Sequence, residues 1–247
     1  MKRLPPVHLL DEDPALLALV PKCDRAAARD ALTAAAYRVP RGPWRPRATF
    51  EHGDTHFGLL LLEGLLIRGV VIGHTTCGEL IGPGELLRPW DDFGDWAPMP
   101  FEVDWKIIEP LRIAVLDHDF AQVVAAWPAL VSVFMERAVE RSHSLALHVA
   151  IHCIKRVDLS LLVLFWHLAD RFGKVSPSGI VVSIKLTHQD LSRLVGATRP
   201  SVTVALGEIA DRGWTVRRDD GSWLLPHDPP PQIQTMLERR QRSRESG

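Results

Sequence analysis

The chain has 247 residues, enough for one large or two modest domains, and its 46% hydrophobic and 24% charged residues are ordinary for a globular protein. A formal net charge of −1 excludes a protein whose whole surface is basic. The longest apolar stretch, 57–67, contains Glu63 and is too short to cross a bilayer, and the first residues lack the pattern of a secretory signal. We therefore expect a cytoplasmic protein with no membrane partner.

Three cysteines, Cys23, Cys77 and Cys153, lie far apart and form no CxxC pair. The ligand spacings of zinc and iron–sulfur sites are therefore missing, and a reduced, cytosolic setting is expected. The sequence also lacks a Gly-x-Ser-x-Gly motif, a Walker loop and an HExxH motif. We predict no metal, no cofactor and no enzymatic activity.

The first third of the chain changes character twice. Residues 4–37 are predicted to be helical, because a leucine-rich segment is followed by the alanine-rich run 26–36. Three prolines and a glycine in 39–46 then interrupt regular structure. Over 48–117, short apolar runs alternate with clusters of Gly, Pro and Asp, which predicts the strands of a sandwich or barrel.

Histidines on these strands suggest one alternative, a metal-dependent or ligand-binding cupin-like enzyme whose last domain serves protein contacts. His52 and His56 are four residues apart and so share one face of a strand, and Glu63 and His74 are further conceivable ligands. The sequence lacks the His-x-His pair that would aim two ligands of one strand at one metal. We therefore favour ordinary surface histidines.

Residues 117–155 are predicted to be helical, with a break near Trp127-Pro128. From 128 to 155 the helix would make about seven turns, at roughly 3.6 residues per turn. We expect one stripe to pack against a partner helix or against the chain's own strands. The stripe contains Leu130, Phe134, Ala138, Arg141, Leu145, Val149 and His152.

Two short helices are predicted after the apolar helix 159–172 and the strand 179–185. Thr187 can cap the first, with Asp190 in the place of the capping-box Glu, and Gly196 ends it. Thr198 can cap the second, and Pro200 falls in its first turn, where a missing N–H costs nothing. This spacing predicts a helix-turn-helix.

A strand, an Asp-Gly turn at 220–221 and a second strand follow the two helices, over 215–225. This pattern predicts a β-wing, so the module is a winged helix-turn-helix. The segment around it also carries the basic excess, since residues 156–247 contain 13 Lys and Arg against 10 Asp and Glu. Phosphate binding requires such a basic excess in the part of the chain that contains the helix-turn-helix.

The sequence LTHQDLSRLVGATRPSVTVALGEIADRGW, residues 186–214, resembles the DNA-binding signature of the Crp/Fnr family of bacterial transcription regulators. The resemblance implies an α+β fold with an N-terminal, cyclic-nucleotide-binding-like β-roll, a long dimerisation helix and a C-terminal winged helix-turn-helix. The expected parts are helices and β-roll sensor over 1–120, dimerisation helix over 121–156, DNA-binding domain over 157–230 and basic tail over 231–247.

The segment 81–90 resembles the Gly-Glu-Leu part of the family's β-roll. The resemblance implies an effector pocket formed by Gly84, Glu85, Leu86, Arg88, Trp90 and Trp105. Family members that sense cyclic nucleotides follow this segment with an Arg next to a small residue, whereas Arg88 here precedes Pro89-Trp90. Because the neighbourhood is acidic, we expect that cyclic AMP is not the signal, and the Gly-Glu residues also suit a plain β-turn.

The resemblance therefore implies a homodimer that binds a two-fold-related site on double-stranded DNA, with RNA polymerase as a further candidate partner and no effector assigned. Arg199 is the expected base-contacting residue, because a guanidinium can bind guanine with two hydrogen bonds. The other expected DNA contacts are Thr187, His188, Gln189, Thr198, Pro200, Ser201 and Thr203, with Arg217 and Arg218 in the wing. Better-known members carry Glu and a second Arg where this chain has Pro200 and Val204, so their target sequence is not implied.

Overall fold

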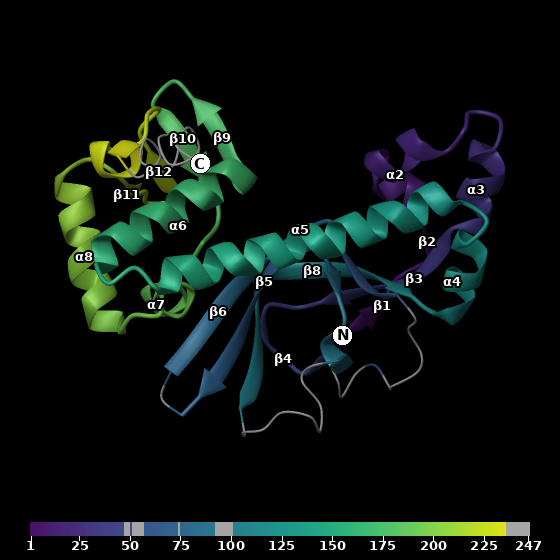
Figure 1. Cartoon of the computed structure of the whole chain (residues 1–247), viewed down its shortest axis with the longest axis horizontal. Coiled ribbons are helices and arrows are strands. Elements are labelled where there is room, and N and C mark those ends of the chain that lie inside the picture. Colours follow the sequence, from purple (N-terminus) through teal and green to yellow (C-terminus); the bar gives the residue numbers. More distant parts are fainter. Residues whose placement is uncertain (47–49, 51–56, 74, 92–100, 236–247) are drawn as a thin grey trace, which may run out of the picture. The chain divides into compact units, whose positions relative to one another are not determined.

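The structure is a computed structural model, and it describes residues 1–46, 50, 57–73, 75–91 and 101–235 (Figure 1). The chain divides into two compact units. The N-terminal unit contains residues 1–75 and 79–146, and the C-terminal unit contains 76–78 and 147–247. No helix in the described ranges is long and apolar enough to span a membrane.

An eight-stranded antiparallel sheet forms the N-terminal unit, with the order β1-β3-β8-β5-β6. The other three of the eight strands are short and lie off this order: β2 pairs with β3, β4 with β8 and β7 with β5. The strands are β1 (Lys2–Arg3), β2 (Val7–His8), β3 (Thr33–Val39), β4 (Gly42–Trp44), β5 (Gly58–Ile72), β6 (Thr75–Ile81), β7 (Leu86–Leu87) and β8 (Glu102–Leu116). The expected β-roll is thereby confirmed.

The two faces of this sheet bury two different cores, because successive side chains of a strand point to opposite faces. Leu59 and Leu61 of β5 and Ile113 of β8 pack with the tryptophans Trp44, Trp90 and Trp105 on one face. Leu60, Ala114 and Leu116 pack on the other face with residues of the helices. Both long strands therefore bury apolar residues on both faces.

The prediction of helix over 4–37 was wrong at both ends, where β2 and β3 lie. Three short helices, α1 (Leu9–Glu12), α2 (Pro14–Leu19) and α3 (Arg25–Ala31), occupy the middle of this segment. Residues 33–39 form strand β3, which pairs with β8 from Ala35↔Val115 to Val39↔Leu111. Pairing with a central strand has overridden the helix preference of the alanines.

Two helices follow the sheet, α4 (His118–Val124) and α5 (Pro128–His152). The break predicted near Trp127-Pro128 is confirmed, and Asp117 caps α4 by accepting from the Phe120 N–H at 2.9 Å. α5 contributes Leu130 and Phe134 to the core of the N-terminal unit. It is also held by ion pairs, from Arg137 to Asp13 at 2.5 Å and from Arg141 to Glu79 at 2.8 Å.

The C-terminal unit combines three helices with a four-stranded antiparallel sheet of order β11-β12-β10-β9. Its elements are α6 (Val157–Phe172), β9 (Gly173–Ser176), β10 (Gly179–Val182), α7 (His188–Val195), α8 (Arg199–Asp211), β11 (Val216–Arg217) and β12 (Trp223–Leu225). Leu161, Leu164, Phe165 and Leu168 of α6 are fully buried, and the Phe165 ring lies 4.7 Å from that of Trp223. α6 is therefore the central core helix of this unit.

Candidate nucleic-acid interface

The first helix of the motif begins with a complete capping box. Thr187 Oγ1 accepts from the Asp190 N–H at 3.1 Å, and the Asp190 carboxylate accepts from the Thr187 N–H at 3.0 Å. Asp190 is fully buried, so these two bonds are shielded from water and fix the first turn of α7. The predicted cap of α7 is therefore confirmed, with Asp in the place of Glu.

Gly196 ends α7 in the left-handed conformation, with φ of 66° and ψ of 30°. A Cβ at this position would collide with the His152 ring, so both the backbone angle and the space require glycine. The turn that follows is short, because α8 already begins at Arg199. With this short turn, α7 and α8 form the helix-turn-helix that the sequence spacing predicts.

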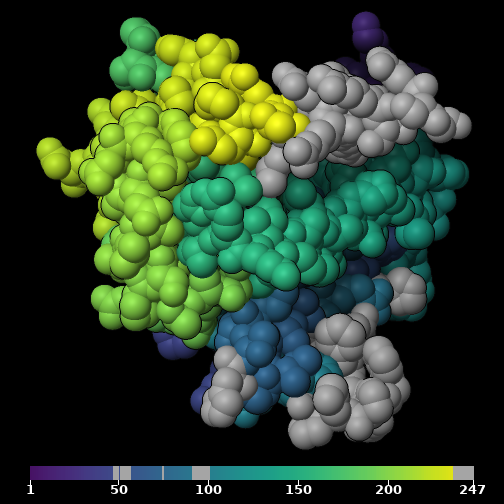
Figure 2. Space-filling model, turned by 60° about the vertical axis from the view of Figure 1, so that its left-hand side comes forward, coloured from purple at the N-terminus to yellow at the C-terminus, as the bar shows by residue number. Residues whose placement is uncertain are grey.

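The outer face of α8 carries the residues expected to contact DNA. Thr198 caps the helix by accepting from the Ser201 N–H at 3.3 Å, and the two hydroxyl groups lie 2.8 Å apart. The inner face is buried through Val202, Ala205, Leu206 and Ile209. Arg199, Pro200, Ser201, Thr203 and Val204 are exposed. The segment with α7 and α8 is light green in Figure 2 and lies at the surface.

The wing is a short hairpin of β11 and β12. The Arg218 N–H donates to the Ser222 carbonyl at 2.9 Å, and Asp220 accepts from the N–H and hydroxyl of Ser222. The Arg217 guanidinium lies 5.7 Å from the ring centre of Trp223, a buried residue. This cation–π contact holds the Arg217 guanidinium against the surface of the unit.

Five of the expected DNA contacts surround one hollow of about 450 Å³, which we call the cationic hollow. Its lining residues are Thr187, His188, Gln189, Arg199 and Arg217. Two guanidinium groups and no carboxylate line it, so it favours an anion. The His188 Nδ1 also lies 2.9 Å from the Thr203 hydroxyl, which joins the start of α7 to α8.

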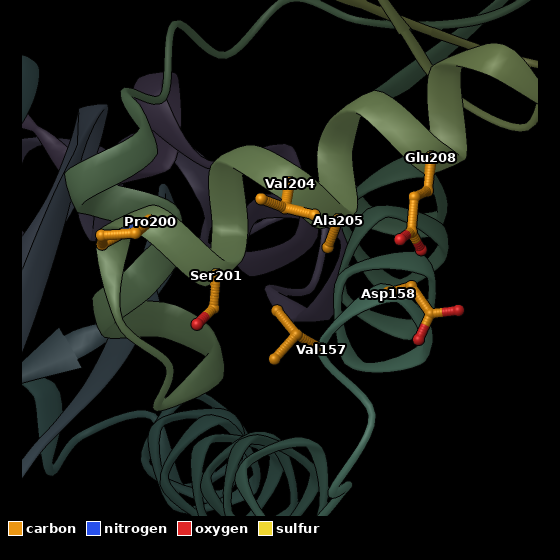
Figure 3. Close-up of a pocket in the computed structure, with 7 residues that line it drawn as sticks. All are labelled: Val157, Asp158, Pro200, Ser201, Val204, Ala205 and Glu208. Atoms are coloured by element: carbon orange, nitrogen blue, oxygen red, sulfur yellow. The ribbon is translucent and has the colours of Figure 1, made fainter.

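A second hollow of about 450 Å³ lies on the other side of α8, and we call it the apolar–acidic hollow (Figure 3). It is lined by Val157, Asp158, Pro200, Ser201, Val204, Ala205 and Glu208. The Asp158 and Glu208 carboxylates lie at the end away from Pro200 and Ser201. The Arg156 guanidinium, 2.6 Å from Asp158, lowers the pKa of that carboxyl below its usual value.

Sequence analysis missed this second hollow because Val157 and Asp158 are some 40 residues from α8 in the chain. One signal could have indicated part of it, since Val204 and Glu208 are four apart and therefore share a helix face. The expected contacts thus divide between the two hollows. Arg199 and His188 line the cationic one, whereas Pro200 and Ser201 line the other.

The residues expected to form an effector pocket have mainly structural contacts. Glu85 accepts from the Gly82 N–H at 3.0 Å, and Gly84 has a φ of 86°, so both belong to the turn before β7. Trp90 and Trp105 are each only 7% exposed and belong to the core of the sheet. Leu86 pairs with Leu60 of β5, and the Arg88 side chain is exposed. The β-turn interpretation of the Gly-Glu residues therefore agrees with their hydrogen bonds.

The predicted partner-facing stripe of α5 needs correction. Leu130 and Phe134 are 1% and 2% exposed and belong to the core of their own unit. Arg141 pairs with Glu79, which also accepts from Arg68 at 3.1 Å. These residues therefore cannot meet a partner helix while the unit remains folded, although Val149 of the same prediction is 56% exposed. The remaining members, Ala138, Leu145 and His152, flank this inward face.

A different stripe of α5 is open to solvent. Its members are alternately three and four residues apart: Ser132, Met135, Val139, Ser142, Ala146, Val149 and, just past the helix, Cys153. All seven are exposed, Met135 by 62% and Val139 by 52%. This is the spacing of the contact positions of a coiled coil. We call it the open stripe.

The three histidines of the enzyme alternative, His52, His56 and His74, all lie outside the described residues. Glu63 is described, and its carboxylate accepts from Arg112 at 2.9 Å. Of the expected basic tail over 231–247, residues 236–247 also lie outside the described part. Ile233, near the start of the tail, is buried.

The fold and the site together define a class: a β-roll unit with a long helix, and a winged helix-turn-helix unit. Comparison with known proteins places the chain within that class. Residues 160–229 match the family model of the Crp-like helix-turn-helix domain. The resemblance to the Crp/Fnr family is therefore confirmed, for this domain and for the fold.

Three relatives illustrate the similarity. The chain is 29% identical over 151 residues to the CRP-like cAMP-activated global transcriptional regulator of Mycobacterium tuberculosis, covering 57% of this chain but only 64% of that protein. CooA from Carboxydothermus hydrogenoformans superposes with a TM-score of 0.63 at 15% identity, covering 94% of this chain and 93% of CooA. A cyclic nucleotide-binding domain containing protein from Listeria monocytogenes gives 0.62 at 15% identity, covering 87% and 96%.

Proposed function

We propose that the chain is a cytoplasmic transcription regulator that binds double-stranded DNA as a homodimer on a two-fold-related operator. The observation that carries the proposal is the exposed first turn of α8, beside which Arg199 and Arg217 line one cationic hollow. A capped helix with an exposed, cation-bearing start is the element that helix-turn-helix proteins insert into the major groove. The relative from M. tuberculosis is described as a transcriptional regulator, which agrees with this function.

The two hollows orient α8 against DNA. The cationic hollow suits the phosphate backbone, whereas the Asp158 and Glu208 carboxylates on the other side would repel phosphate. We therefore propose that the backbone passes over Thr187, His188, Gln189 and Arg217. Arg199 then points toward base edges, and the Thr198 and Ser201 hydroxyls lie near the next phosphate.

Thr203 and Val204 contribute differently to base recognition. The Thr203 hydroxyl donates to the Arg199 carbonyl at 3.1 Å and also contacts His188, so it has no free hydrogen for a base. Val204 is 63% exposed and offers only apolar surface, which suits a thymine methyl group. Readout in this chain therefore combines one strong polar contact with apolar contacts.

We propose that dimerisation uses the open stripe of α5. A largely apolar stripe with three-four spacing can pack against a second copy of itself, and a dimer with two-fold symmetry contains two copies of α8. The half-sites are then about 34 Å apart, roughly one turn of DNA. RNA polymerase is a further candidate partner, and we assign no effector.

For the sensor we propose that cyclic AMP is not the signal, although the M. tuberculosis relative is described as cAMP-activated. The Arg141 guanidinium is already neutralised by Glu79 and lies 3.6 Å from Glu85. A cyclic phosphate bound at Arg141 would have to displace these carboxylates, because burying a phosphate without a compensating cation is costly.

A salt titration tests DNA binding. A fluorescently labelled, random-sequence duplex is titrated with the protein over a series of salt concentrations. Several phosphate contacts predict a slope of log K against log salt of about −0.9 for each phosphate neutralised. Arg217→Ala, which removes the proposed backbone cation, should flatten the slope by about one phosphate's worth. A wild-type slope near zero would contradict the proposal.

A further inference from the structure

We propose that the cationic hollow holds one backbone phosphate of bound DNA, and that His188 takes up a proton when the phosphate enters. The inference rests on the proposed DNA binding and adds a pH dependence to it. It starts from the hydrogen bonds of a single imidazole ring.

The hydrogen bonds around Thr203 favour the tautomer of neutral His188 that carries its proton on Nδ1. The Thr203 hydroxyl has one hydrogen, and it donates this hydrogen to the Arg199 carbonyl at 3.1 Å. At its contact of 2.9 Å with His188 Nδ1, the Thr203 oxygen must therefore accept. Nδ1 carries the hydrogen, so Nε2 of the neutral ring has only a lone pair.

Burial and the charges around His188 disfavour the protonated ring in the free protein. Arg199 faces it from α8 and Arg217 faces it from β11, while Asp190 on its own helix is engaged in the capping box. Burial, then Arg217, then Arg199 lower the pKa of His188 below its ordinary value. Without an anion in the hollow, a third positive charge is unfavourable.

A phosphate in the hollow reverses this balance. Its negative charge offsets both guanidinium groups, and its oxygens need hydrogen-bond donors. The bare Nε2 of neutral His188 is an acceptor and would face a phosphate oxygen with its lone pair. Uptake of one proton from solvent at Nε2 forms an N–H donor and adds one positive charge, while the Nδ1 bond to Thr203 remains. DNA affinity must then fall as pH rises, because the bound state holds the extra proton.

The test uses a labelled random-sequence duplex of about 30 base pairs, roughly three helical turns, at constant ionic strength. Binding is measured between about pH 6 and about pH 8, the range around the ordinary imidazole pKa. The wild type should lose affinity with rising pH, at most about tenfold per pH unit for each His188. His188→Gln should abolish this dependence, and His188→Arg should bind tightly at every pH.

Two further measurements separate this effect from a structural role of His188. Calorimetry in two buffers of different ionisation enthalpy should detect proton uptake by the wild type and none by His188→Arg. Nitrogen NMR of the free protein at high pH should show the proton on Nδ1. His227→Gln removes an exposed histidine of the same unit and should keep the wild-type pH dependence.

The possible outcomes are distinguishable. If the wild type binds no DNA at any pH, the proposed function itself is wrong. If it binds DNA but His188→Gln keeps the wild-type pH dependence, or the neutral ring carries its proton on Nε2, only the present inference is overturned. Melting temperatures confirm that each variant is folded.

Discussion

At the scale of single residues, the outer face of α8 has few polar groups left for bases. Thr203 is bound to Arg199 and His188, and Thr198 and Ser201 bond to each other. Arg199 is therefore the one side chain of this first turn with several hydrogen-bond donors suited to a base edge. Sequence discrimination should depend strongly on it.

Replacing Arg199 by Ala should weaken binding to the preferred DNA site by about 1–3 kcal/mol and relax specificity at one base pair. Binding isotherms on the preferred site, on single-base variants and on random DNA measure this. Arg218→Ala in the wing is the matched control, and it should weaken all duplexes alike. An equal loss on every duplex for Arg199→Ala would assign Arg199 to the backbone instead.

Because of His167 in α6, we expect the C-terminal unit to lose stability in acid. Burial, with His148 and Arg171 nearby, lowers the pKa of His167 to about 4, from an ordinary 6.5. Its ring lies 5.5 Å from that of His148. The unfolded chain binds this proton more readily than the folded chain. The contribution of neutral His167 to the free energy of unfolding is therefore complete above about pH 6.5 and is lost as the pH falls toward about 4.

The loss should reach about 2–3 kcal/mol, after allowance for the partial exposure of the ring. Denaturant unfolding at a series of pH values measures it. His167→Phe should flatten this part of the pH profile, and His227→Gln should leave it unchanged. An unaltered profile in His167→Phe would mean that other groups cause the acid loss.

At the scale of elements, α5 has two faces with separate roles. One face supplies Leu130, Phe134, Arg137 and Arg141 to the N-terminal unit. The open stripe, from Ser132 to Cys153, lies on the opposite side. A helix with a buried face and an unpaired apolar stripe at coiled-coil spacing is suited to dimerisation.

The double variant Val139→Glu/Val149→Glu should therefore be monomeric, because in a dimer it brings four carboxylates together in an apolar contact. Sedimentation measures the state. Leu147→Glu is the matched control, an exposed apolar residue of the same helix outside the open stripe, and should leave the dimer intact. Phe134→Glu should instead unfold the N-terminal unit, by placing a charge in its core. A dimeric double variant would locate the interface elsewhere.

The elements also show what a sequence can predict. The caps at Thr187, Gly196 and Thr198 were found because capping depends on residues within one turn. The outward side of α5 was not found, since the stripe from Leu130 to Arg141, with spacings of four, four and three, and the open stripe are both plausible helix faces. The strand at Ala34–Ala36 and the apolar–acidic hollow depend on partners distant in the chain, which local patterns do not identify.

At the scale of the whole molecule, the central question for the sensor is whether the β-roll unit responds to a cyclic nucleotide. Glu85 is used by a turn, Trp90 and Trp105 fill the core, and Glu79 shares its carboxylate between Arg68 and Arg141. Among the described residues, Arg68 and Arg141 are thereby neutralised. An anionic ligand bound at either of them would have to break a buried ion pair.

Calorimetric titration with cyclic AMP and with cyclic GMP should therefore show no binding in the micromolar range, and neither should change DNA affinity. The M. tuberculosis relative described as cAMP-activated is the positive control for the assay. Micromolar binding of either nucleotide with tighter DNA binding would overturn this part of the account. Arg88 would then be the first residue to replace.

The most direct measurement is selection of binding sites from a pool of random duplexes with the wild-type protein. The account predicts an enriched inverted repeat whose half-site centres are about 34 Å apart, one turn of DNA. The protein should bind this repeat at least about a thousandfold more tightly than random DNA at physiological salt. A pool that yields no enriched sequence, or only a single unrepeated half-site, would contradict the central claim that this chain is a dimeric, sequence-specific DNA-binding regulator.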